Sequence, residues 1–334
     1  MIPLRHKLTR GSFTLDVDVE IPDTGITGVF GESGSGKTTL LRCIAGLEQM
    51  DGIPAHKRNV GYVFQDPALF PHLTVRGNIE YGARRATTHR VDSALVVAML
   101  GISDLLDRKP GSLSGGEAQR VAIAAALLRS PDIVLMDEPL ASLDRRRKDE
   151  LLPYFDRLHD ELAVPVIYVS HDIDEICRLC DHLILLEDGG VAADGDLFDV
   201  VARVDVPMLS GQNAGVVLWA TPIDHEEGLT RFDFGDGEIW APGEFEVGRH
   251  PMRLRVAASD VSIVRERPSQ TTIQNVIRAT IEAVHPVDAA TALVRLETGH
   301  QNLLSQVTNR SIRRLGLEVG DRVFAQVKSV TVRH

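Results

Sequence analysis

The sequence predicts an α/β fold for about the first 210 residues and a β-rich region after them. Three observations support this expectation. Short apolar runs alternate with helical patterns over the first two-thirds of the chain, which favours a mostly parallel sheet covered by helices. A glycine-rich turn joins one of these strands to a helix. After about Asp205 helical periodicity nearly vanishes, and short alternating segments take its place.

Six apolar runs are the expected strands of the first region: Phe13–Ile21, Ile26–Phe30, Val60–Phe64, Ile133–Met136, Val166–Val169 and Leu183–Leu186. We expect an antiparallel strand at the early edge of this sheet. Between about residues 67 and 130 the strand patterns stop, which indicates an inserted helical subdomain. Asp188-Gly189-Gly190 is a hairpin turn signal near the end of the region.

The C-terminal region has the pattern of a small β barrel. Its alternating segments include Arg253–Val256, Val261–Val264 and Ala292–Leu296, and turn residues such as Ala241-Pro242-Gly243 separate them. We therefore expect three parts: an α/β domain at 1–210 with its helical subdomain at about 67–130, a β-rich connecting region at 211–268, and a terminal domain at 269–334.

Composition excludes several classes of function. The formal net charge of −11 argues against nucleic acid as a partner, because phosphate neutralisation needs a basic face. Three cysteines are too few for a disulfide scaffold. Cys177 and Cys180 fall on one face of a predicted helix, where core packing is expected rather than metal or redox chemistry. The apolar runs are shorter than the ~20 residues of a membrane helix, and no signal peptide is expected.

The strand Ile26–Phe30 leads into a phosphate-binding loop, Gly31-Glu32-Ser33-Gly34-Ser35-Gly36-Lys37-Thr38, and a helical pattern beginning at Thr39 follows it. Glycines let backbone N–H groups converge on phosphates, and the helix N-terminus adds a positive dipole end. Lys37 is placed to reach the β- and γ-phosphates, and the Thr38 hydroxyl is placed for Mg²⁺. The alternative is a glycine-rich turn without a ligand.

A buried strand ends in two carboxylates, Asp137 and Glu138. Ligands of parallel α/β sheets bind at the carboxyl ends of the strands. Asp137 is therefore expected to orient Mg²⁺, and Glu138 to polarise the attacking water as the general base. Without the upstream loop, such a pair would more often cap a helix.

Between these two motifs stands the segment Leu113-Ser114-Gly115-Gly116-Glu117. Because this segment follows a phosphate-binding loop and precedes a strand that ends in Asp-Glu, the chain resembles the ATP-binding-cassette (ABC) ATPases. The resemblance implies a P-loop ABC ATPase domain, with a RecA-like core and a helical subdomain, that binds ATP and Mg²⁺. It also implies that Gln65 touches Mg²⁺ and water, that His171 is the switch histidine at the γ-phosphate, and that Ser142-Leu143-Asp144 links two active sites.

Ser114, Gly115 and Gly116 precede a helical run, so they offer a hydroxyl and free N–H groups to an anion. The phosphates in the same chain are already held by residues 31–38. In the ABC family the second anion site closes on the γ-phosphate of the other protomer. We therefore expect a head-to-tail homodimer with two ATP molecules between the chains.

The tail, about 269–334, resembles the Mop-type oxyanion-binding domains of molybdate importer ATPases, an OB-like β barrel. Matching stretches include Thr272-Ile273-Gln274-Asn275 and the segment from Val319 to Ser329. The candidate oxyanion ligands are Thr272, Asn275, Lys328 and Ser329. Gln274 stands where family members commonly carry arginine, which removes a cation. The alternative is a structural or dimerising barrel that binds no anion.

Together these resemblances imply the ATP-binding subunit of a molybdate or tungstate importer. Such a subunit is peripheral, at the cytoplasmic face of the inner membrane. It works with two transmembrane permease subunits, coupled through residues 66–74, and indirectly with an external substrate-binding protein. The alternatives are an importer ATPase for sulfate, iron or sugars, a soluble ABC ATPase, and a P-loop kinase, which the segment at 113–117 and His171 disfavour. The tail could also act as a sensor that binds molybdate and shuts transport.

Two features differ from the usual pattern of the family. The stretch from Glu48 to Asn59 is short, since most import ATPases carry a longer strand-containing segment there. An aromatic residue that stacks on adenine is hard to place. Phe13 is the candidate, although it fits a strand core position equally well.

Overall fold

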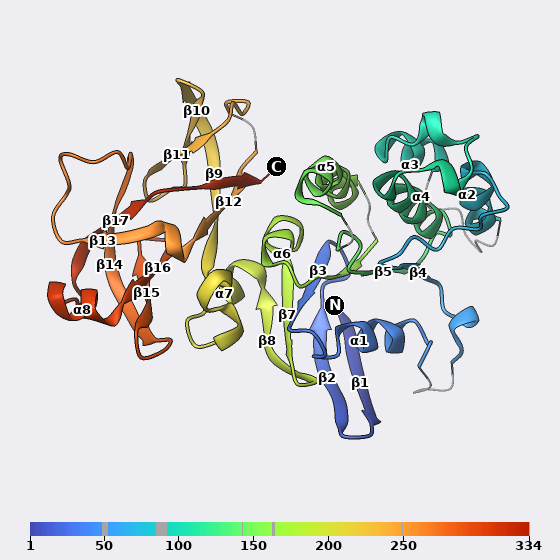
Figure 1. The fold of residues 1–334 in the computed structure, drawn as a ribbon, viewed down its shortest axis with the longest axis horizontal. Helices are drawn as coiled ribbons and strands as arrows, with labels where there is room; N and C mark the ends of the chain where they lie inside the picture. Colours follow the sequence, from blue (N-terminus) through green and yellow to red (C-terminus); the bar gives the residue numbers. More distant parts are fainter. Residues whose placement is uncertain (49–52, 85–91, 142, 162–163, 249, 334) are drawn as a thin grey trace. The chain divides into compact units, whose positions relative to one another are not determined.

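The computed structural model describes residues 1–48, 53–84, 92–141, 143–161, 164–248 and 250–333. The chain divides into two compact units, Met1–Gly195 and Asp196–His334. Figure 1 shows a sheet with helices in the first and a β-rich architecture in the second. Among the described residues, no helix has both the length and the apolar character needed to cross a membrane.

The first unit is built on an eight-stranded sheet with the order β1-β2-β8-β7-β3-β6-β5-β4. Its strands are β1 (Ile2–Arg10), β2 (Phe13–Ile21), β3 (Ile26–Phe30), β4 (Val60–Val63), β5 (Ile133–Asp137), β6 (Val166–Val169), β7 (His182–Glu187) and β8 (Gly190–Asp196). The pairs β3–β6, β3–β7, β4–β5 and β5–β6 are parallel, and β1 pairs antiparallel with β2 at the edge. The predicted α/β class and its antiparallel edge are confirmed.

Two strands were not among the sequence predictions. In β1 only Leu4 is buried, and Arg5 and Lys7 pair with Asp18 and Asp16 of the neighbouring strand. Charged residues on the outer face of an edge strand interrupt the apolar run that a strand prediction relies on. The strand β8 follows the predicted hairpin turn, in which Asp188 and Gly189 both adopt positive φ.

The helices of the first unit are α1 (Lys37–Ile44), α2 (Val75–Ala83), α3 (Ser93–Met99), α4 (Gly115–Leu127), α5 (Arg145–Glu161) and α6 (Ile173–Leu179). The described residues between β4 and β5 form α2, α3, α4 and short 3-10 turns. This is the predicted helical subdomain, and it carries the segment 113–117 at the start of α4 (Figure 1).

Helices cover both faces of the sheet because successive residues of a buried strand point to opposite sides. Val29 of β3 belongs to one core cluster with Leu40 and Leu41 of α1. On the opposite face, a Cβ added to the neighbouring Gly28 would meet Ile176 of α6 and Cys180, the residue directly after that helix. Cys177 and Cys180 are both buried, as expected for core packing.

The second unit consists of two five-stranded sheets, β11-β10-β9-β12-β18 and β13-β17-β14-β15-β16. Its elements are α7 (Leu197–Val201), β9 (Gly215–Glu226), β10 (Leu229–Asp233), β11 (Glu238–Pro242), β12 (Met252–Ala257), β13 (Val261–Val264), β14 (Asn275–Pro286), β15 (Thr291–Glu297), β16 (Asn302–Thr308), α8 (Asn309–Leu315), β17 (Arg322–Val327) and β18 (Thr331–Arg333). In the second sheet β13 also lies against β16, so the sheet curls as in an OB-like barrel.

In both sheets the pairing of strands crosses the expected boundary near 268. The strand β13 lies before residue 268 but pairs with β17, and β18 from the tail pairs with β12. One hydrophobic cluster contains residues from both sheets, among them Leu254 and Ile281. The expected boundary near 268 therefore falls inside a single compact unit.

Candidate functional site

The candidate site lies where three parallel strands end. Val29 of β3 and Asp137 of β5 are both paired with Val169 of β6. Since the strands are parallel, the residues that follow them meet at one edge of the sheet. A cavity of about 500 Å³ opens there, lined by Phe13, Ser33, Gly34, Gly36, Lys37, Thr38, Thr39, Glu138 and His171. Eight of the residues predicted for the nucleotide site thus line one cavity, together with Phe13.

Lys37 is held inside the curled loop. Its Nζ donates to the backbone oxygens of Gly31 at 2.7 Å and of Glu32 at 2.8 Å. Burial lowers the pKa of Lys37, while the charges of Glu138 and Asp137 act in the opposite direction. A positive φ of 105° at Gly36, where a Cβ would meet the Phe13 ring at 2.9 Å, explains the need for glycine.

The phosphate loop contains an unsatisfied polar group. Ser35 is buried, and its hydroxyl has no hydrogen-bond partner among the described residues. A buried polar atom without a partner costs free energy, so such atoms are often satisfied by a ligand. This observation fits a loop shaped to bind anionic oxygens.

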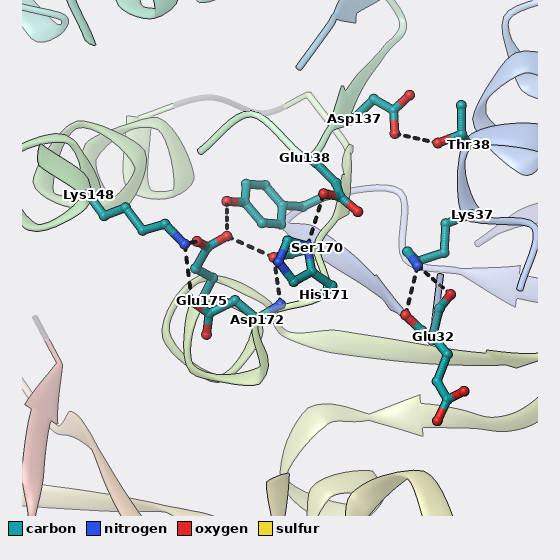
Figure 2. A network of polar contacts seen from close by, with 12 residues as sticks. Glu32, Lys37, Thr38, Asp137, Glu138, Lys148, Ser170, His171, Asp172 and Glu175 are labelled. Atoms are coloured by element: carbon teal, nitrogen blue, oxygen red, sulfur yellow. Dashed lines mark hydrogen bonds and ion pairs between the residues drawn. The ribbon is translucent and has the colours of Figure 1, made fainter. Parts of the chain in front are cut away.

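Two side chains hold Asp137 at the end of β5. Thr38 Oγ1 donates to Asp137 Oδ1 at 3.0 Å, as Figure 2 shows. Tyr62 OH donates to Asp137 Oδ2 at 3.0 Å. Burial raises the pKa of Tyr62, and the charge of Asp137 raises it further. Oxygen ligands of this type are those that Mg²⁺ prefers. Sequence reasoning missed Tyr62, whose place in β4 gave no sign of this contact.

Glu138 and His171 contact one another in the wall of the cavity. His171 Nδ1 lies 2.9 Å from Glu138 Oε2, as Figure 2 shows. Glu138 has a φ of 47°, which is unusual for a residue other than glycine, asparagine or aspartate. Its N–H donates to the Val169 carbonyl at 3.0 Å, which anchors this backbone. Strained backbone of this kind clusters at functional sites.

Gln65 lies at the same edge but outside the residues that line the cavity. It is exposed, two residues beyond Val63, which pairs with Met136 next to Asp137. The structure therefore places Gln65 beside the strand that carries Asp137. Gln119 of α4 donates to the carbonyl of Phe64 at 3.4 Å, so this segment is joined to the helical subdomain.

The residues Ser114, Gly115 and Gly116 do not line the cavity. Ser114 caps α4: its Oγ accepts from the Glu117 N–H at 3.3 Å, and the Glu117 carboxylate accepts from the Ser114 N–H at 2.7 Å. These hydrogen bonds lower the pKa of Glu117. The helix start is therefore rigid, and Ser114 and Gly115 are exposed.

Asp144 stands before α5, away from the cavity lining. Its Oδ1 accepts from the Arg147 N–H at 3.0 Å, which caps the helix. Ser142 lies outside the described residues. Leu143 is buried and would be the nearest neighbour of a Cβ on Gly115. The segment before Asp144 thus contacts the start of α4.

In the second unit the candidate oxyanion residues surround the start of β14 and the end of β17. Asn275 pairs with Val327, so Thr272 lies shortly before one strand and Lys328 and Ser329 directly after the other. Asn275 is already engaged, because its side chain accepts from the Trp240 N–H at 2.7 Å and donates to the Trp240 carbonyl at 3.0 Å. Thr272, Lys328 and Ser329 are exposed.

Comparisons with known proteins find one family model in each of the two compact units. Residues 15–141 match the ABC transporter family, and residues 271–333 match the TOBE domain. The solved structure of cbiO1 from Clostridium perfringens, part of the ABC transporter complex cbiONQ, covers 61% of this chain and 92% of its own. Its TM-score is 0.53, at 26% identity.

Two curated relatives are similar over nearly the whole chain. A molybdenum import ATP-binding protein of Methylococcus capsulatus is 49% identical over 99% of both chains. A second, from Azotobacter vinelandii, is 46% identical over 99% of this chain and 98% of its own. At this identity and coverage, the chain belongs to the family of molybdenum import ATP-binding proteins, within the ATP-binding subunits of ABC transporters.

Proposed function

We propose that the protein hydrolyses ATP to energise the import of molybdate, with tungstate as the chemically equivalent alternative. The observation that best supports ATP hydrolysis is the contact between Glu138 and His171, whose side chains lie 2.9 Å apart in the cavity that Lys37 also lines. The cargo is supported by the names of relatives that match both units of the chain. Importers of sulfate, iron or sugars are the competing assignment.

The residues divide the work of phosphoryl transfer. Backbone N–H groups of the loop from Gly31 to Thr39 bind the phosphates, and Lys37 leaves its carbonyl partners to neutralise their charge. Glu138 orients a water molecule and accepts its proton as the general base. His171 holds Glu138 at its side and contacts the γ-phosphate. Phe13, in the cavity wall, is the proposed platform for adenine.

Thr38 and Asp137, with Gln65, would hold Mg²⁺, because a hydroxyl, a carboxylate and an amide oxygen are suitable hard ligands. The 3.0 Å hydrogen bond between Thr38 and Asp137 shows that two of these groups already converge. When bound, Mg²⁺ would neutralise charge on the β- and γ-phosphates.

We propose that two copies of the chain act together. Ser114, Gly115, Gly116 and Asp144 lie outside the cavity of their own chain, although the start of α4 offers an exposed anion site. A head-to-tail homodimer would bring these residues onto the γ-phosphate of the partner chain.

A groove between β4 and the helical subdomain supports docking to the permease. It has a volume of about 300 Å³ and is lined largely by apolar side chains, among them the exposed aromatics Phe64, Phe70 and Tyr81. Asn78 fixes the backbone of Phe70 by accepting from its N–H at 2.7 Å and donating to its carbonyl at 3.2 Å. A rigid apolar groove of this form suits an amphipathic helix.

Replacing Phe70 with serine is expected to weaken binding of the permease. Aromatic anchors of interfaces contribute about 2 kcal/mol or more, which is roughly 30-fold in affinity. Pull-down of the two permease subunits at several concentrations of the purified chain measures this change. Leu95→Ser, on the exposed side of α3, is the matched control. Equal binding by Phe70→Ser and the wild type would contradict docking at this groove.

The proposed assembly places the chain peripherally at the cytoplasmic face of the inner membrane, on two permease subunits served by an external binding protein. In the tail, Thr272, Lys328 and Ser329 remain the proposed oxyanion ligands, while the contacts of Asn275 with Trp240 support a structural role for that residue.

The assembled complex in liposomes tests this function. ATP hydrolysis should rise when the external binding protein is supplied with molybdate or tungstate, and should stay at its basal rate with sulfate. Stimulation by sulfate alone would assign the complex to a different cargo.

A further inference from the structure

An ion pair lies behind the catalytic pair, and the proposed reaction assigns it no role. Lys148 Nζ of α5 is 2.6 Å from Glu175 Oε1 of α6. The Glu175 side chain is only 5% exposed, compared with 19% for Lys148. A buried carboxylate needs compensating partners, since leaving it unpaired is costly. The pair is therefore a specific link between α5 and α6.

The second carboxylate oxygen of Glu175 is also engaged (Figure 2). Tyr168 OH donates to Oε2 at 2.9 Å, and Ser170 Oγ donates to the same oxygen at 2.8 Å. Tyr168 is fully buried, and its ring packs edge-on against Phe155 of α5. One side chain thus joins α5, α6 and the end of β6.

These contacts fix the backbone on both sides of His171. Ser170 Oγ accepts from the Asp172 N–H at 3.0 Å, and Asp172 Oδ2 lies 3.2 Å from Lys148 Nζ. His171 itself is 59% exposed and is held to Glu138 by its ring nitrogen. With so little packing of its own, the position of the imidazole depends on Ser170 and Asp172.

The other end of the network reaches the segment expected at the dimer interface. Lys148 lies one helical turn after Asp144, and its N–H donates to the Asp144 carbonyl at 2.9 Å. Burial alone would lower the pKa of Lys148, but hydrogen bonds and charge from Glu175 and Asp172 raise it overall. Lys148 therefore stays protonated and keeps both carboxylates attached to α5.

We propose that Lys148, Glu175 and Ser170 are positioning residues that hold His171 against Glu138 and link it to the Asp144 segment. This inference rests on the proposed ATPase function. A change at Asp144 would act on the site through Lys148 and Glu175, which are connected to His171. A shift of the start of α5 would then change the alignment of the imidazole.

The test measures ATP hydrolysis by the full chain with Glu175→Gln or Lys148→Met. Each substitution is made in the wild-type background and again in a His171→Ala background. In the wild-type background each is expected to lower kcat about 100-fold, the effect of a displacement near 1 Å, with KM for ATP unchanged. Lys148→Arg should restore most of the rate. In the His171→Ala background, single-turnover hydrolysis should fall no further, because residues that act through one partner are not additive.

Arg146→Met is the matched control, since its ion pair with Glu150 is exposed on the same helix. Wild-type rates for Glu175→Gln, or equal losses with and without His171, would overturn the inference. So would unfolding of Glu175→Gln, which would assign the network to the fold alone. If the wild-type chain failed to hydrolyse ATP, the proposed function itself would fail, which is a separate result.

Discussion

Replacing Glu138 with glutamine is expected to lower kcat for ATP hydrolysis by about 100- to 10,000-fold, the usual contribution of a general base. The amide cannot accept a proton from water. ATP binding should persist, because the phosphate loop and Lys37 are unchanged. The variant should therefore accumulate as an ATP-bound homodimer, which light scattering with and without ATP detects.

Glu20→Gln is the control for this variant, since Glu20 is exposed on β2, away from the residues that line the cavity. It should hydrolyse ATP at the wild-type rate. A Glu138→Gln chain that retained full activity would remove Glu138 from the reaction. If Glu138→Gln lost hydrolysis but its chains did not associate in ATP, the role of Glu138 as general base would stand and the proposed homodimer would be contradicted.

Replacing Lys37 with methionine is expected to abolish tight nucleotide binding. Hydrogen bonds to charged groups contribute about 1.5–3 kcal/mol, which corresponds to roughly a 10- to 150-fold higher Kd. The fold should tolerate the change, because methionine removes a charge that is already largely buried. Equilibrium binding of a fluorescent ATP analogue measures the effect, with thermal unfolding as the check on folding.

Lys57→Met, an exposed lysine before β4, serves as the matched substitution. Its Kd should equal that of the wild type. An unchanged Kd for Lys37→Met would mean that the loop binds phosphates through its backbone alone, and the role of the lysine would have to be revised.

The sequence was most informative where chemistry depends on short, contiguous segments. The phosphate loop, the Asp137–Glu138 pair and His171 each follow a buried strand, and the parallel sheet brings these strand ends together without further information. The hydrophobic pattern therefore predicted the fold class and the strand end that carries Glu138. Family resemblance added Gln65, His171 and Asp144, whose roles are proposals.

Contacts between distant segments could not be predicted. Tyr62 reaches Asp137 only because β4 and β5 are neighbours, and Glu175 joins Lys148 only because α5 and α6 pack together. Nothing in the local pattern around either residue indicates its partner. The strand β1 was missed for another reason, since charges on its outer face interrupt the apolar run.

The C-terminal unit shows a similar limit. The predicted alternating segments correspond to β12, β13 and β15, but the pairing of the strands crosses the expected boundary near 268. Asn275, a predicted oxyanion ligand, makes a contact that the sequence did not indicate, because its amide binds the Trp240 backbone. Which backbone group a side chain satisfies is decided by tertiary structure.

We propose that ATP hydrolysis by this chain drives molybdate across a membrane, and an uptake assay measures this transport most directly. The complex would be reconstituted in liposomes with ATP on the side of the ATPase subunits and molybdate-loaded binding protein on the other. Molybdate should accumulate only when ATP is present, Glu138→Gln should abolish the accumulation, and sulfate should not replace molybdate. Uptake that continues with Glu138→Gln, or ATP-driven uptake of sulfate without molybdate, would contradict the proposed function.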